Sequence, residues 1–143
     1  MPVEILGALE LFMVEAIGMT AVAIASVTAG KLTLAQWRAL VVLGRTDGLR
    51  VGDVAQAVGM SLPSASRLIR RLERRGFATT VRDPSDRRAT LVRLTPKGTA
   101  IRQDVIDCRR EMMEAALQLY APHLPTRLAP GLAAIATALA QYK

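Results

Sequence analysis

Five arginines recur at helical spacing within one short segment, residues 62 to 75. They are Arg67, Arg70, Arg71, Arg74 and Arg75. Positions three and four apart lie on one face of an α-helix, so this spacing gathers the guanidinium groups on one side. A guanidinium is always charged, and its fork of N–H donors matches phosphate oxygens and the major-groove edge of guanine. The chemistry that these residues predict is recognition of duplex DNA.

A second pair of arginines, Arg87 and Arg88, lies in a predicted hairpin loop. Two runs with strand-forming character, residues 77–82 and 89–95, flank the sequence Asp-Pro-Ser-Asp-Arg-Arg at 83–88. Asp-Pro followed by Ser and Asp is typical of a turn. A helix fits the major groove of B-DNA and a narrow loop can place a guanidinium in the minor groove. The two arginine groups therefore predict a winged helix-turn-helix.

The helix that carries the first arginines has clear boundaries in the sequence. Ser61 is expected as its N-cap, Pro63 falls in its first turn, and Gly76 is expected to end it. An apolar stripe is predicted to face the core. The stripe comprises Leu62, Ala65, Leu68, Ile69 and Leu72, and Ser64 shares the opposite face with the arginines.

The net excess of positive charge lies in this part of the chain. Residues 67 to 102 hold eleven Lys and Arg against three acids, a net charge of +8, whereas the whole chain is +7. A run of charges is usually a solvated face. Here it coincides with a motif of the size of a DNA groove, which favours a polyanion-binding surface.

The remaining periodicity predicts five further helices. They span residues 4–29, 34–45, 51–58, 96–120 and 126–141, with Thr33 and Thr95 as N-caps, a minimal strand at Leu49-Arg50 and the tight turn at 59–61. Inward faces are assigned to Trp37, Leu40, Val41 and Gly44 in the second helix and to Val51, Val54, Ala55 and Val58 in the third. The fold class expected is mainly α with a small β-hairpin wing (α+β), a winged helix-turn-helix with N- and C-terminal dimerisation helices.

The first helix is unusually apolar. Glu10 and Glu15 interrupt it, and the apolar run that follows is shorter than the roughly 20 residues of a membrane span. We expect a helix buried on most sides and, in so small a protein, a partner subunit. The predicted division is a dimerisation region, residues 1–31 plus 97–143, and a DNA-binding region, residues 32–96, in one intertwined domain.

The 143 residues are 51% hydrophobic and include one cysteine and one histidine. This composition predicts one globular domain without a disulfide framework, in a reducing cytoplasm, and no zinc-type ligand cluster. Neither a nucleophile–base pair nor a phosphate-binding glycine loop is found. We therefore expect no enzyme, no cofactor, no metal and no membrane partner.

Four segments resemble the MarR family of bacterial transcriptional regulators (multiple-antibiotic-resistance regulators). They are LTLAQWRAL, VGDVAQAVGMS, SRLIRRLERRGF and, above all, DPSDRRATLVRLTPKG, and together they cover roughly residues 32 to 102. The resemblance implies a homodimer that binds a pseudo-palindromic operator and usually represses. It also implies a small-molecule effector, often phenolic or carboxylate, between the dimer helices and the DNA-binding lobe.

The resemblance also assigns residues. Arg88, with Arg87 beside it, reaches the minor groove, and Asp86 helps hold the shape of the wing. A second group lies on or near the major-groove face: Ser61, Ser64, Ser66, Arg67 and Arg71. From position alone, Ser64 and Arg67 favour contact with base edges. For Arg70 and Arg74, phosphate contact and plain solvation remain equally open.

Other chemically distinctive residues are interpreted structurally. Cys108 is expected as a buried core thiol, with a redox-responsive regulator as the alternative function. His123 is expected in a bend, at a hinge or on the surface, and Trp37 in the core, where it is the one candidate for lining an effector site. A winged helix that binds protein partners is the remaining alternative, and its reading helix would be acidic or apolar instead of arginine-rich.

Overall fold

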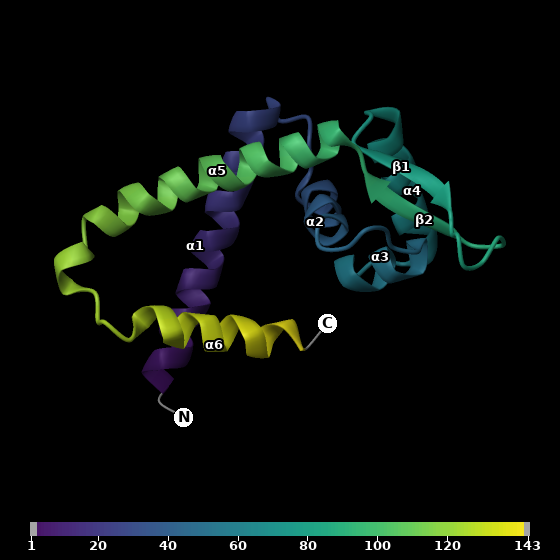
Figure 1. Ribbon diagram of the computed structural model, residues 1–143. Coiled ribbons are helices and arrows are strands. Elements are labelled where there is room, and N and C mark those ends of the chain that lie inside the picture. The colour runs from purple at the N-terminus through teal and green to yellow at the C-terminus, as the bar shows by residue number, and fades with distance from the viewer. Residues whose placement is uncertain (1–2, 142–143) are drawn as a thin grey trace. The chain divides into compact units, whose positions relative to one another are not determined.

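The computed structural model describes residues 3–141 and confirms a mainly α fold with one hairpin (Figure 1). The elements are α1 (Val3–Thr28), α2 (Leu34–Leu43), α3 (Val51–Val58), α4 (Leu62–Arg74), β1 (Ala78–Arg82), β2 (Thr90–Leu94), α5 (Pro96–Gln118), the short 3-10 helix η1 (Ala121–His123) and α6 (Leu128–Ala140). Two compact units divide the chain after Arg110. The first contains every element from α1 to β2 and the first part of α5.

Helices α3 and α4 form the predicted helix-turn-helix. Gly59 ends α3 in the left-handed conformation, with a φ of 73°, which costs glycine little because it has no Cβ. Ser61 then caps α4 by accepting the backbone N–H of Ser64. Gly76, with a φ of 74°, follows the last turn of α4 as predicted. These two glycines and the cap fix where the arginine-bearing helix begins and ends.

Strands β1 and β2 form an antiparallel hairpin in which Ala78 pairs with Leu94 and Arg82 with Thr90. The loop between them projects beyond the helices in Figure 1. Of the minimal strand predicted at Leu49-Arg50, only Leu49 is confirmed, since it pairs with Val92 of β2 through two backbone hydrogen bonds of 3.0 and 2.7 Å. The hairpin is thereby joined to the chain segment that leads into α3.

The core of the first unit lies among α2, α3, α4, β2 and α5. Its most deeply buried side chains are Leu40, Leu43, Val54, Leu72, Val92 and Val105. Two details of the predicted faces are wrong. Leu62, the first residue of α4, is 55% exposed and not part of the buried stripe. Helix α2 ends at Leu43, and it buries Ala39 and Val42, whereas Val41 is half-buried and Gly44 exposed.

Helix α1 is long and apolar enough to cross a membrane. Only 22% of its most apolar stretch is buried inside the protomer. Its buried residues, Thr20, Ala23, Ile24 and Thr28, all lie in its C-terminal half. Helix α1 is therefore not buried on most sides within one protomer, and its burial by a partner subunit stays a prediction. The C-terminal half packs against the rest of the first unit, and the N-terminal half exposes its apolar side chains.

Helix α5 is nearly as long as predicted, and Thr95 caps it by accepting the backbone N–H of Gly98. Along its expected apolar stripe only Val105 is fully buried, and Ala115 and Leu119 are exposed. In the second unit, α6 buries none of its described residues. The stripe of α5 and the whole of α6 therefore lack a complete apolar partner within the described part of one protomer.

We expect Gly98→Ala to destabilise the fold by at least about 2 kcal/mol, because overpacking against backbone leaves little room to relax. A Cβ at this position would lie 1.9 Å from the carbonyl oxygen of Phe77. Urea unfolding followed by circular dichroism would measure the loss.

Gly52→Ala in α3 is the matched control for this substitution. A Cβ there meets no atom within 4 Å, so the free energy of unfolding should stay unchanged or rise by about 0.5–1 kcal/mol. Equal stability of the two variants would contradict the close packing of α5 on Phe77.

Candidate nucleic-acid interface

The exposed face of α4 carries most of the predicted contact residues. Arg67, Arg70, Arg71 and Arg74 are all exposed, and Ser64 and Ser66 are half-exposed. The hydrophobic stripe on the other side of the helix, Ala65, Leu68, Ile69 and Leu72, is buried. Burial of one face and exposure of the other fixes the rotation of α4 about its axis. The arginines are therefore turned outward by packing.

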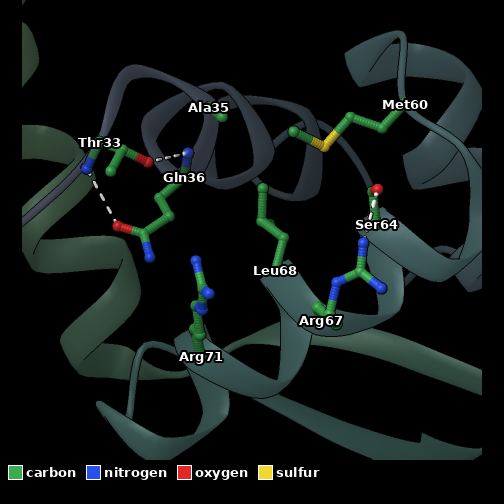
Figure 2. A pocket seen from close by; sticks show the side chains of 8 residues that line it. All are labelled: Thr33, Ala35, Gln36, Met60, Ser64, Arg67, Leu68 and Arg71. Carbon is green, nitrogen blue, oxygen red and sulfur yellow. Dashed lines mark hydrogen bonds between the residues drawn. The ribbon is translucent and has the colours of Figure 1, made fainter.

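A pocket of about 220 Å³ lies between α2 and α4 (Figure 2). Leu68, Met60 and Ala35 supply its apolar side, and Arg67 and Arg71 supply charge. At its other wall, Thr33 and Gln36 form a capping box that starts α2, with hydrogen bonds of 3.2 and 3.0 Å. Thr33 was predicted as the cap, but the contribution of Gln36 was not.

The arginines of α4 are held differently from one another. Arg67 donates from Nη2 to Ser64 Oγ at 3.1 Å, and Arg70 donates from Nε to the carbonyl oxygen of Ser66 at 3.4 Å. Arg75 is directed away from this group. It donates to the carbonyl oxygen of Lys31, and its guanidinium lies 4.9 Å from the ring centre of Phe77. The other four arginines, Arg67, Arg70, Arg71 and Arg74, form the outward-facing set.

The wing arginines are separate from the α4 set and lie in the hairpin loop. Arg87 and Arg88 are both exposed, and within residues 3–141 neither guanidinium has a hydrogen-bond or ion-pair partner. Asp86 lies just before them. Its Oδ1 accepts the backbone N–H of Arg88 at 3.0 Å, and its carbonyl oxygen accepts the N–H of Ala89 at 2.9 Å. These bonds fold the loop so that both guanidinium groups point into solvent.

The wing is also fixed by a residue that the sequence analysis missed. Arg50, which precedes α3, pairs through Nη2 with Asp83 Oδ2 at 3.2 Å and with Asp86 Oδ2 at 3.5 Å. The side chain of Asp83 is only 9% exposed. Its other carboxylate oxygen accepts hydrogen bonds from the Ser85 backbone N–H at 2.9 Å and the Ser85 hydroxyl at 2.6 Å.

These bonds lower the pKa of Asp83. The two hydrogen bonds from Ser85, with the Arg50 guanidinium in addition, lower the pKa of Asp83 from 3.8 to about 2. The carboxylate is thus ionised at any physiological pH. The only sequence signal for Arg50 was its place in the predicted minimal strand Leu49-Arg50, because its ion-pair partners are 33 and 36 residues away along the chain.

Trp37 is buried, with 3% of its surface exposed, and also lines a groove of about 660 Å³ between α1, α2 and α5. Ile17, Val41 and Ile106 contribute to its apolar wall. Four arginines line the same groove: Arg38, Arg45, Arg102 and Arg109. The groove therefore combines an indole and aliphatic side chains with concentrated positive charge.

Cys108 is half-buried, so the prediction of a fully buried core thiol is wrong for one protomer. His123 lies exposed in η1, in the bend where it was predicted. Among the described residues, 3–141, no group of three His, Cys, Asp or Glu is arranged to hold a metal ion.

The helix-turn-helix, the hairpin and the outward-facing arginines define a winged helix-turn-helix protein. Residues 31–89 match the model of the MarR family. An uncharacterized HTH-type transcriptional regulator of Bacillus subtilis, YfiV, is 28% identical over 112 residues, which are 78% of this chain and 70% of YfiV. The transcriptional activatory protein BadR of Rhodopseudomonas palustris is 40% identical over 76 residues, which are 51% of this chain and 43% of BadR.

Solved structures share the fold. RV1404 from Mycobacterium tuberculosis has a TM-score of 0.86 at 24% identity, over 96% of this chain and 94% of that one. FabT of Streptococcus pneumoniae, solved in complex with DNA, has a TM-score of 0.73 at 18% identity, over 97% and 94% of the two chains. CouR of Rhodococcus jostii RHA1, bound to p-coumaroyl-CoA, has a TM-score of 0.69 at 23% identity, over 93% and 89%.

Similarity to the MarR family therefore covers residues 31–89 of the winged helix-turn-helix, and solved structures such as RV1404 share the fold. This confirms the resemblance that the four sequence segments indicated. The matched segment, residues 31–89, contains α2, α3, α4 and the arginine-bearing loop. The relatives found by sequence are transcriptional regulators.

We expect Asp83→Asn to destabilise the protein in a pH-dependent way. The folded-state pKa of about 2 lies below the ordinary value of 3.8, so the ionised carboxylate favours the folded chain. This contribution is complete above about pH 4 and is lost as the pH falls from about 4 toward about 2. Urea unfolding of both proteins between pH 7 and pH 2.5 should show the difference in stability shrinking across that window.

Asp47→Asn is the control for this titration. Asp47 also pairs with an arginine, Arg93, at 3.4 Å, but its side chain is 91% exposed. Removing its charge should change stability little at any pH. If the two variants lost the same stability with the same pH profile, the proposed role of Asp83 in holding the wing would be wrong.

Proposed function

We propose that the protein is a cytoplasmic, homodimeric MarR-type repressor that binds a pseudo-palindromic operator in double-stranded DNA and responds to a small-molecule effector. The observation that supports this most directly is the outward-facing arginine face of α4, which packs in the same compact unit as the wing. Arg67, Arg70, Arg71 and Arg74 are exposed on the helix, and Arg88 is exposed in the loop. These two positive surfaces suit the major and the minor groove respectively.

The type of DNA contact that each of these residues makes follows from its position in α4 or in the wing. Ser61, Ser64 and Arg67 lie on the first two turns of α4, where a reading helix meets base edges. Ser66 lies between Ser64 and Arg67, on or near the same major-groove face. Further along the helix, Arg70, Arg71 and Arg74 are positioned for the sugar-phosphate backbone, which orients the protein without specifying sequence. Arg87 and Arg88 enter the minor groove, and Asp86 holds the loop that carries them.

The dimer is supported by apolar surface that one protomer leaves exposed. Along residues 3–17 of α1 the exposed large hydrophobic residues are Val3, Ile5, Leu6, Leu11, Phe12, Met13, Val14 and Ile17. A contiguous apolar surface of this kind marks an association site in soluble proteins. Residues 1–31 and 97–143 form the dimerisation region, and residues 32–96 form the DNA-binding region.

We assign the apolar face of α1 to a second protomer instead of a membrane. Glu10 and Glu15 would each have to enter the bilayer if α1 spanned it, which is costly. We also assign no catalytic step to the chain, since its function is accounted for by DNA and effector binding.

The effector site that the geometry supports is the groove between α1, α2 and α5. Its apolar wall includes Trp37, and its charge comes from four arginines, so its ligand is an amphipathic organic acid. Arg102 bears on this assignment because its Nε is buried without a hydrogen-bond partner among the described residues. Arg102 also packs over Gly44, where a Cβ would lie 2.5 Å from Nε.

An effector can act by changing the distance between the two reading helices. Two half-sites on one face of B-DNA are roughly 34 Å apart or a multiple of that distance. A ligand lowers DNA affinity to the extent that it binds the protomer arrangement with the wrong spacing more tightly. No base contact needs to change.

Two alternative functions can be distinguished experimentally from an effector-responsive DNA-binding regulator. A winged helix that binds protein partners would not need the exposed arginines of α4. A redox-responsive regulator acting through Cys108 gains some support from the half-exposed thiol. Loss of DNA affinity on peroxide treatment that Cys108→Ala prevents would favour the redox regulator over the effector-binding one.

We expect Arg88→Ala to weaken binding to the selected operator by about tenfold or more, because the charge in the minor groove is lost. The operator would be obtained by selecting bound fragments from random duplex DNA, and affinity would be measured by fluorescence anisotropy. The slope of log affinity against log salt should become shallower by roughly 0.9 if the guanidinium contacts a phosphate.

Arg110→Ala is the matched control, since Arg110 is an exposed arginine on α5 outside the reading helix and the wing. It should bind the operator like the unmodified protein. Light scattering should show both variants as dimers. Full operator affinity in a folded, dimeric Arg88→Ala variant would rule out the role of the wing.

Trp37 provides a direct test of the effector groove, because it is the only tryptophan in the chain. We expect its fluorescence to change on titration with an aromatic carboxylate such as benzoate or with p-coumaroyl-CoA. Arg109→Met should weaken this binding by about tenfold, since a charge-assisted hydrogen bond is lost. Arg110→Met, one position further along α5 and not in the groove, should leave it unchanged. An unchanged affinity in Arg109→Met would contradict the groove as the acid-binding site.

A further inference from the structure

Three side chains along the first two turns of α4 are linked by hydrogen bonds. The Ser61 hydroxyl donates to Ser64 Oγ at 3.0 Å, and Arg67 Nη2 donates to the same oxygen at 3.1 Å. Ser61 Oγ itself accepts the backbone N–H of Ser64. The residues are three apart, so they lie on one face of the helix. Figure 2 shows the Arg67 guanidinium directed to Ser64 at the edge of the pocket between α2 and α4.

Once the hydrogen bonds among Ser61, Ser64 and Arg67 are formed, the groups of Ser64 and Arg67 that remain free are all donors. Both lone pairs of Ser64 Oγ are occupied, one by the Ser61 hydroxyl and one by Arg67. The hydroxyl hydrogen of Ser64 is therefore free to donate. Arg67 uses one of its five N–H groups on Ser64 and keeps four, which include a forked pair.

A donor-only surface discriminates among bases in the major groove. Guanine presents two adjacent acceptors there, N7 and O6, whereas adenine and cytosine each present an amino group that a donor-only surface cannot satisfy. Thymine presents one acceptor and a methyl group, which matches a guanidinium fork less well.

We propose that Ser61, Ser64 and Arg67 form a relay that holds the Arg67 guanidinium ready to recognise one guanine in each half-site. This rests on the proposed DNA-binding function. Arg67 is the residue that contacts the base. Ser64 acts mainly as a positioning residue, because its oxygen restricts the long, flexible side chain of Arg67 before DNA arrives.

The test replaces, one at a time, each guanine of the selected half-site by 7-deazaguanine, which keeps its base pairing but lacks the N7 acceptor. We expect one position at which affinity falls by about tenfold, the size expected for a lost arginine–guanine pair. In Arg67→Ala this sensitivity should disappear. A half-site without guanine, or equal tolerance of 7-deazaguanine at every position, would overturn the proposal.

The positioning role is tested with two substitutions of Ser64. Ser64→Ala should reduce the sensitivity to 7-deazaguanine at that position to about twofold, because the guanidinium is no longer held. Ser64→Thr keeps a hydroxyl and should restore it. Circular dichroism would establish that α4 stays helical in both. Sensitivity in Ser64→Ala equal to that of the unmodified protein would show that Arg67 needs no relay.

Arg74→Ala is the matched control, since Arg74 lies at the other end of α4. It should weaken binding to all sequences by a similar factor and keep the sensitivity at the guanine position. If random duplex DNA is not bound even at low salt, the proposed function itself fails. If DNA is bound but no guanine position depends on Arg67, only the relay is wrong.

Discussion

Burial of the apolar stripe of α4 is the constraint on which the rest of the structure depends. Leu68, Ile69 and Leu72 are removed from water against α3, the hairpin and their neighbours, and this fixes the rotation of the helix about its axis. The arginines project into solvent because they occupy the opposite side. A change in helix rotation would bury guanidinium groups at a cost far larger than the surface interactions could offset. The hydrophobic core thus determines which polar groups can meet DNA.

The wing depends on the same core through two connections. Val92 is fully buried and also pairs with Leu49, which anchors the hairpin in the first unit. Arg50, the next residue, carries this connection to the loop through its ion pairs with Asp83 and Asp86. The loop arginines are consequently presented from a folded loop, so less ordering is required when DNA binds.

Helix α2 connects the effector groove to the reading helix. Its first turn, at Thr33 and Gln36, lines the pocket beside α4, and Trp37 one residue later lines the groove between α1, α2 and α5. A ligand that shifts α2 therefore acts on a helix that already packs against the helix-turn-helix. This is a short physical route between the proposed effector and the proposed DNA surface, and it passes through packed side chains.

The sequence by itself determined the main helices and the hairpin, most of their boundaries to within two residues, and the resemblance to the MarR family. Caps such as Ser61 and Thr33, the glycine at 76 and the spacing of the arginines are local signals, and local backbone chemistry obeys them. Only the tertiary structure decided which groups meet across long sequence separations. Arg50 reaches Asp83 over 33 residues, and Arg102 packs over Gly44 from another helix. It also decided that Leu62, the N-terminal half of α1 and the stripe of α5 are exposed in one protomer, because a hydrophobic pattern states that a face must be covered but not by which partner.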